Sequence, residues 1–81
     1  MQAQRELERY RNDALYFEGR RQELLRQHPE RWIAVYEQQV VGTATRLPQL
    51  IKLLEKRGLP RRRVFIEHLS AKEDLLILLS R

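Results

Sequence analysis

Residues Trp32 to Thr45 read WIAVYEQQVVGTAT, in which two runs rich in β-forming residues flank a polar Glu37-Gln38 step. This pattern predicts a β-hairpin with a two-residue turn. The expected register has four pairs: Val35 with Val40, Ala34 with Val41, Ile33 with Gly42 and Trp32 with Thr43. Two-residue turns favour Asn-Gly or Asp-Gly, whose residues accept positive φ angles, so Glu-Gln is a poor turn sequence. A longer loop here would keep the hairpin and shift its register.

Alternation along the hairpin places apolar side chains on both of its faces. One face would carry Ile33, Val35, Val40, Gly42 and Ala44, and the other would carry Trp32, Ala34, Tyr36, Val41 and Thr43. We expect the helix after the hairpin to cover the first face. The second face then needs another cover, which is either the N-terminal helix of this chain or a second protein.

The N-terminal segment predicts an amphipathic helix from about residue 4 to residue 27. Its inward positions recur at alternating spacings of three and four: Leu7, Tyr10, Ala14, Phe17, Arg21 and Leu24. Roughly 24 residues would span about 36 Å, which is longer than the predicted sheet. We therefore expect the first turns to extend beyond the sheet, to fray or to pack on another chain. We also expect a bend or break at Gly19 and an end at His28-Pro29.

A second helix is predicted after the hairpin, with Thr45 as its N-cap and Pro48 in its first turn. Its core-facing residues would be Leu47, Leu50, Ile51 and Leu54. Gly58, Leu59 and Pro60 have the order expected of a helix C-terminus with a left-handed glycine. A third strand follows at residues 64–69, with Val64, Ile66 and His68 on one face and Phe65, Glu67 and Leu69 on the other.

The C-terminal residues allow two interpretations. Ser70-Ala71-Lys72-Glu73 matches a capping box and favours a helix, whereas Leu75 to Leu79 has no amphipathic period and the usual length of a strand. We favour a fourth strand, with a helix as the alternative. The chain as a whole predicts one α+β domain over residues 1–81, with an N-terminal helix (about 4–27) and an αβ core (about 29–81). The expected order is helix, hairpin, helix, strand and fourth strand, in a mostly antiparallel sheet with helices packed on it.

The composition limits the classes of function. The 81 residues include no cysteine, which excludes disulfides and thiolate metal sites. The N-terminus lacks the apolar region of a signal peptide, and the longest apolar run is far below the roughly 20 residues of a membrane span. We therefore expect a cytoplasmic protein without membrane contact. The net charge of +5 favours anionic partners such as nucleic acid or an acidic protein surface.

Candidate catalytic groups are few. His28 and His68 are the two histidines, and Glu30 or Glu67 would be their partners in a metal site or an acid-base pair. Glu67 and His68 are consecutive in a predicted strand, so their side chains point to opposite faces and cannot converge. We predict no catalytic residue, no metal, no cofactor and no small-molecule substrate.

Two groups of residues are candidates for binding. The densest basic cluster consists of Lys56, Arg57, Arg61, Arg62 and Arg63. These are candidate anion contacts for a phosphate backbone, although a solvated turn that complements the dipole of the preceding helix is the interpretation we favour. The candidate protein interface consists of Trp32, Tyr36, Val41, Leu75, Ile77 and Leu79. Exposed apolar patches with aromatic anchors are typical of interfaces.

Five sets of residues carry a resemblance to other proteins: Trp32-Ile33-Ala34-Val35, Val40-Val41-Gly42, Leu47 to Leu54, Gly58 with Pro60, and Val64-Phe65-Ile66. With them, residues 29–69 resemble a small prokaryotic domain family of unknown function that has a Trp-Val-Ala hairpin, a leucine-rich helix and a closing Val-x-Ile strand. The chain departs from that pattern in its Glu-Gln turn and its longer N-terminal helix. The resemblance implies an accessory or antitoxin-like partner of another protein.

These observations lead to one expected function and one alternative. We expect a non-enzymatic protein-interaction module, either self-associating or accessory to a partner protein. The alternative is a basic nucleic-acid-binding accessory protein, which the positive net charge would suit.

Overall fold

The computed structural model describes residues 2–71 of the chain. Its elements are α1 (Gln2–Gly19), α2 (Arg21–Gln27), β1 (Arg31–Tyr36), β2 (Gln39–Ala44), α3 (Leu47–Lys56), the short 3-10 helix η1 (Arg61–Arg63) and β3 (Phe65–Leu69). The strands form one antiparallel sheet in the order β2-β1-β3. The α+β prediction is confirmed. The expected fourth strand, with the interface candidates Leu75, Ile77 and Leu79, lies outside the described residues.

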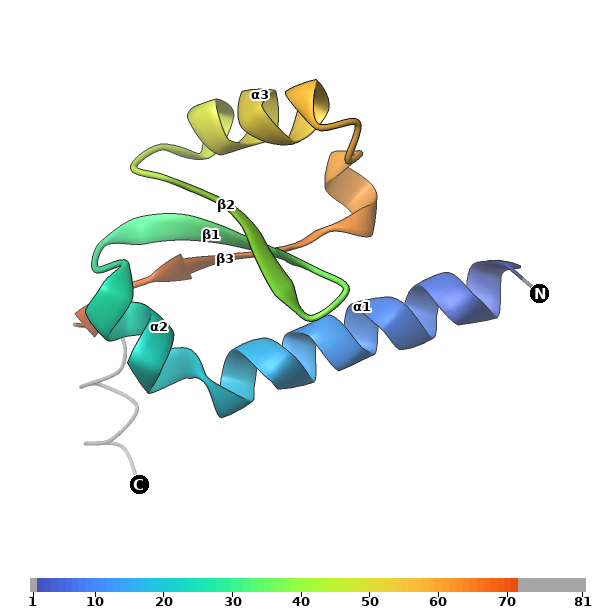
Figure 1. Ribbon diagram of the computed structural model, residues 1–81, viewed down its shortest axis with the longest axis horizontal. Helices are drawn as coiled ribbons and strands as arrows, with labels where there is room; N and C mark the ends of the chain where they lie inside the picture. Colours follow the sequence, from blue (N-terminus) through green and yellow to red (C-terminus); the bar gives the residue numbers. More distant parts are fainter. Residues whose placement is uncertain (1, 72–81) are drawn as a thin grey trace.

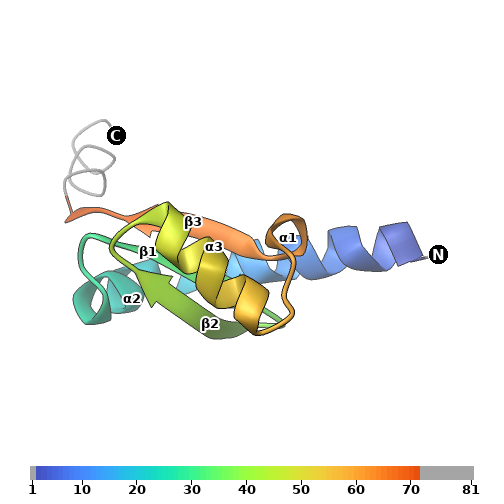
Figure 2. The ribbon, with the colours of Figure 1, turned by 90° about the horizontal axis from the view of Figure 1, so that it is seen from above.

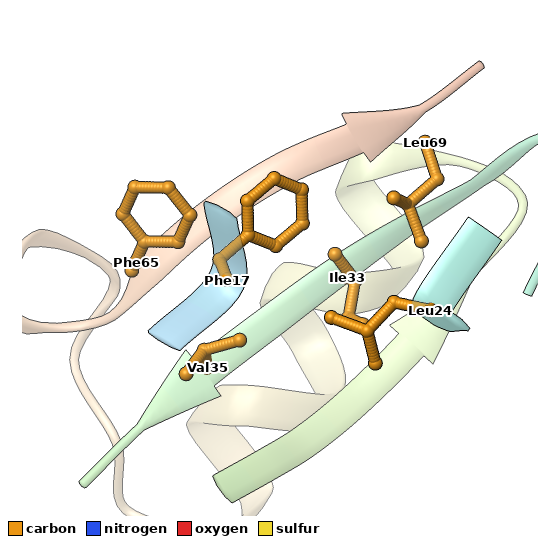
Figure 3. Packing of buried hydrophobic residues seen from close by; sticks show 6 residues of the cluster. All are labelled: Phe17, Leu24, Ile33, Val35, Phe65 and Leu69. Carbon is orange, nitrogen blue, oxygen red and sulfur yellow. The ribbon is translucent and has the colours of Figure 1, made fainter. Parts of the chain in front are cut away.

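The sheet lies between two helical layers, with α3 on one face and α1 and α2 on the other (Figure 1, Figure 2). The first core cluster fills the α1/α2 side and contains Phe17, Leu24, Ile33, Val35, Phe65 and Leu69 (Figure 3). The second fills the α3 side and contains Ala34, Ala44, Leu50, Leu54 and Val64. The central strand β1 supplies both clusters, and Ile33, Ala34 and Val35 are fully buried in succession.

The predicted hairpin register is correct beside the turn and wrong beyond the pair of Val35 with Val40. Val35 pairs with Val40 as predicted, but a β-bulge then leaves Val41 as an extra residue. Ala34 therefore pairs with Gly42, and the two pairs that follow are also shifted by one residue. The bulge has a partner from a distant helix end, because Arg57 Nη1 donates a hydrogen bond of 2.9 Å to the Val41 carbonyl.

The helical covers are the reverse of the expected ones. Ile33 and Val35 pack under α1 and α2, whereas α3 covers the opposite face of β1. The bulge explains this arrangement, because it moves Gly42 and Ala44 onto the face of Ala34 and creates a surface of small residues. There α3 approaches closely: a Cβ atom added to Gly42 would lie 2.7 Å from a methyl group of Leu53.

The Glu37-Gln38 turn adopts the two-residue form, although neither residue is glycine or asparagine. Both have positive φ angles, 52° and 60°, a conformation that is unfavourable for ordinary side chains. The side chain of Asp13 compensates from α1. Its carboxylate accepts hydrogen bonds from the backbone N–H groups of Glu37 (3.1 Å) and Gln38 (2.7 Å), and Asp13 itself is fully buried.

The expected N-terminal helix is broken in two at Gly19 and Arg20, where a bend or break was predicted. The Arg20 N–H closes the end of α1 on the Phe17 carbonyl at 3.1 Å, and the Arg20 carbonyl then accepts from Leu24 at the start of α2. The break brings Phe17 and Leu24 into the same core cluster. The first turns of α1 extend past the sheet as expected, and Leu7 remains 68% exposed (Figure 1).

The ends of α3 agree with the sequence on one side only. At the C-terminus, Gly58 has a φ of 72°, and the N–H groups of Gly58 and Leu59 donate to the Glu55 and Leu54 carbonyls, which is a Schellman motif. At the N-terminus the prediction of Thr45 as the cap is wrong. The cap residue is Arg46, and the Thr45 hydroxyl instead donates to the side-chain carbonyl of Gln49 at 3.2 Å.

Strand β3 begins one residue later than predicted, but its faces are the expected ones. Phe65 and Leu69 lie in the α1/α2 cluster, and Val64 and Ile66 pack in the α3 cluster. Its pairing with β1 is regular over five residue pairs, from Arg31 with Leu69 to Val35 with Phe65.

Substitution of Asp13 tests the contact with the turn. Asp13→Ala removes the acceptor of two charge-assisted hydrogen bonds, so we expect the free energy of unfolding to fall by about 3 kcal/mol or more in a urea titration followed by circular dichroism. Glu8→Ala is the matched control on an exposed position of the same helix, with an expected change within about 0.5 kcal/mol. The loss should shrink when Glu37-Gln38 is replaced by Asn-Gly, which holds the turn without help. Equal losses in both backgrounds would contradict this role.

The two exposed glycines should respond to alanine with opposite signs. A Cβ atom would meet nothing within 4 Å at either Gly19 or Gly58, so steric crowding plays no part. Gly58→Ala forces a side chain into the left-handed region and should lower the free energy of unfolding by about 1 kcal/mol. Gly19→Ala adds a better helix former and should raise it by up to about 1 kcal/mol. The same urea titration measures both, and equal signs would refute the assignment.

Candidate protein-interaction site

The aromatic face of the hairpin is largely covered by this chain. Trp32, Tyr36 and Val41 are half-buried and pack against the α3 cluster. The Trp32 ring lies edge-on to the ring of His68, with 5.1 Å between centroids, and the guanidinium of Arg9 lies 4.6 Å from the centre of the Tyr36 ring. The cover of this face is therefore mainly α3, and the N-terminal helix that the sequence suggested contributes Arg9 over Tyr36.

Among the described residues, the large apolar side chains that remain exposed lie mainly on α1. The exposed fractions are 68% for Leu7, 64% for Leu15, 44% for Tyr10 and 36% for Val40. Leu7 and Tyr10 are three residues apart and therefore neighbours on one side of the helix. Leu15 lies on a different side and lines another hollow, together with Tyr16 and Gln38.

Leu7 and Tyr10 line a groove of about 370 Å³ between α1 and η1. We call it the α1–η1 groove, and it is lined by Glu6, Leu7, Arg9, Tyr10, Arg62 and Arg63. Figure 1 shows η1 facing the N-terminal half of α1, beyond the start of β3. The Tyr10 ring packs edge-on against Phe65, the first residue of β3, with 5.6 Å between centroids. This contact fixes one wall of the groove to the core.

The α1–η1 groove is positively charged, because three arginines and one glutamate line it. Arg63 Nε lies 3.2 Å from Glu6 Oε1 in a half-exposed ion pair that joins η1 to α1. Arg62 is exposed, and Arg9 has a buried Nε atom without a hydrogen-bond partner. The groove therefore combines exposed apolar side chains with guanidinium groups.

The five candidate anion contacts have different surroundings in the structure. Arg62 and Arg63 line the α1–η1 groove, whereas Arg57 is bonded to the Val41 carbonyl. Lys56 and Arg61 are exposed. The sequence contained the arginines and the apolar Leu7 as separate signals, and it placed Leu7 on the inward stripe of the helix, whereas the structure leaves it exposed. It gave no sign that η1 lies beside α1, because the groove residues of the two elements are more than fifty positions apart.

Two of the candidate catalytic residues, His28 and Glu30, take part in hydrogen bonds in the described part of the chain. The backbone N–H of His28 closes α2 on the Leu24 carbonyl, and Glu30 Oε1 accepts from the Ala71 N–H at 3.4 Å. Within residues 2–71, no three His, Cys, Asp or Glu side chains come together as a metal site would require. Nor does any helix in that range have the length and apolar character to cross a membrane.

Two further hollows lie along α1 on the side of the hairpin turn, with volumes of about 540 and 380 Å³. Polar side chains such as Asn12 and Gln38 line both of them.

Comparison of the chain with family models, with curated proteins and with solved structures found no match. The case for a function therefore depends on the surface of this chain alone.

Leu7 and Leu15 form a matched pair of exposed leucines outside both core clusters. We expect Leu7→Asp and Leu15→Asp each to change the free energy of unfolding by no more than about 0.7 kcal/mol, which is the helix-propensity difference. Urea titration of the two variants beside the parent chain checks this. A loss of several kcal/mol in Leu7→Asp would mean that Leu7 belongs to the core and is not a surface residue.

Proposed function

We propose that this chain is a non-enzymatic protein-interaction module that binds through the α1–η1 groove. The observation that carries the proposal is the exposure of Leu7 and Tyr10 beside Arg62 and Arg63. Both faces of the sheet already have helical covers, so these apolar side chains are not needed to complete the core.

The composition of the groove supports a protein partner. Tyrosine and arginine are enriched among the residues that dominate interface energetics, and they act best beside apolar contacts that exclude water. A small domain with this surface can bind a second copy of itself or serve as the accessory partner of another protein. We propose both forms, in a cytoplasmic setting. Further interface candidates are Trp32, Tyr36, Val41, Leu75, Ile77 and Leu79.

The alternative is a nucleic-acid-binding accessory protein, and one observation favours it. Lys56, Arg61 and Arg62 are exposed on the same short stretch of chain. Phosphate contacts of this kind give binding that weakens steeply with salt. A labelled oligonucleotide that does not shift at about 50 mM salt would exclude this function.

Self-association is tested by sedimentation velocity from micromolar to millimolar concentration. If the module binds itself, the parent chain should sediment above its monomer mass of 9.8 kDa, and Leu7→Asp should return it to the monomer. Leu15→Asp is the control and should behave as the parent does. A monomer throughout would exclude the self-associating form and leave the accessory one.

The accessory form is tested with a photo-crosslinking residue at position 7 or 15 of the full chain in its host cells. We expect protein adducts from position 7 in excess of those from position 15. If neither position gives protein adducts and the chain is monomeric, the proposed function is wrong.

A further inference from the structure

We infer that the α1–η1 groove binds an acidic amphipathic segment of a partner protein, in which carboxylates flank one or two apolar anchor residues. This inference rests on the proposed function and specifies the chemistry of the partner. It follows from the charge of the groove, its apolar lining and its size.

The charge comes first. Arg9, Arg62 and Arg63 line the groove together with one acidic residue, Glu6, so the lining residues have a net positive charge of two, although the Arg9 guanidinium lies over the Tyr36 ring. A guanidinium group is planar and can bind a carboxylate through two parallel hydrogen bonds, which makes this pairing geometrically specific. Glu6 Oε1 lies 3.2 Å from Arg63 Nε, and both side chains are about half exposed. A partner with carboxylates would complete the charge balance.

The apolar lining determines what else the partner must carry. Leu7 and Tyr10 form one side of the groove, and their exposure of 68% and 44% leaves apolar area for a partner to cover. The volume of about 370 Å³ is small even for a ligand pocket, for which about 300–1,000 Å³ is usual. The groove can therefore hold one or two side chains of a segment that lies across it.

The same lining distinguishes a peptide from a nucleic acid. A phosphate backbone gains from the arginines and nothing from Leu7, whereas an acidic amphipathic segment gains from both. The contribution of Leu7 to binding is thus the measurement that separates the two partners. Leu15 offers the same side chain at similar exposure on the same helix, outside the groove.

The test selects random twelve-residue peptides by phage display on the full chain and then measures the selected peptides by fluorescence anisotropy. We expect them to be enriched in Asp and Glu next to Leu, Ile or Phe. Affinity should fall at least tenfold in the double variant Arg62→Glu and Arg63→Glu, and also in the uncharged variant Leu7→Ala. The charge-matched control is Arg26→Glu with Arg46→Glu, in or beside elements at the other end of the molecule (Figure 1). This control and Leu15→Ala should bind as the parent does.

Other results would overturn the inference. Selected peptides without acidic residues that still need Leu7 would show an apolar site, in which case the interaction module stands and its acidic partner does not. Acidic peptides that bind the charge-matched control as weakly as the groove variant would show attraction by net charge alone. An oligonucleotide that displaces the peptides and binds Leu7→Ala as tightly as the parent would assign the groove to nucleic acid. Both proposals would be rejected if no selected peptide depended on Leu7 for binding and if crosslinking at position 7 gave no protein adduct.

Discussion

The fold depends on one contact, in which the buried carboxylate of Asp13 accepts the two backbone N–H groups of the hairpin turn. Glu37 and Gln38 adopt left-handed angles that disfavour each of them by about 1–2 kcal/mol. Two hydrogen bonds to a charged acceptor contribute about 1.5–3 kcal/mol each, which is enough to offset that strain. The contact thus holds a tight turn whose sequence would otherwise favour a longer loop.

The arrangement of the two layers follows from that turn. A two-residue turn sets Val35 opposite Val40, and the bulge at Val41 then moves Gly42 and Ala44 to the face of Ala34. The small residues on this face admit α3, and the larger Ile33 and Val35 on the other face meet Phe17 and Leu24. Because Asp13 lies on α1, the same contact also positions that helix against the hairpin. One side chain therefore couples the register of the sheet to the placement of its helical cover.

The sequence predicts the parts of this structure that depend on local patterns. The Schellman end of α3, the faces of β3 and the break near Gly19 each follow from residues within one or two turns of chain. The partnership between Asp13 and the turn joins residues 24 and 25 positions apart, and the bulge and the reversed covers depend on contacts between separate elements, none of which a periodicity reveals. The site divides in the same way. The arginines are visible as a cluster and Leu7 as an apolar position, but their meeting in one groove requires η1 to pack beside α1.

The length of α1 links the fold to the proposed site. The core needs this helix only from Asp13 and Phe17 onward, yet α1 extends eleven residues before Asp13, which is about 16 Å. An isolated helix of that length is marginal in water, but one that continues an anchored helix needs no new nucleus. Tyr10 against Phe65 and Glu6 with Arg63 hold the extension to β3 and η1. Leu7 is therefore presented from a fixed position outside the core, which limits the conformational entropy that a partner would lose on binding there.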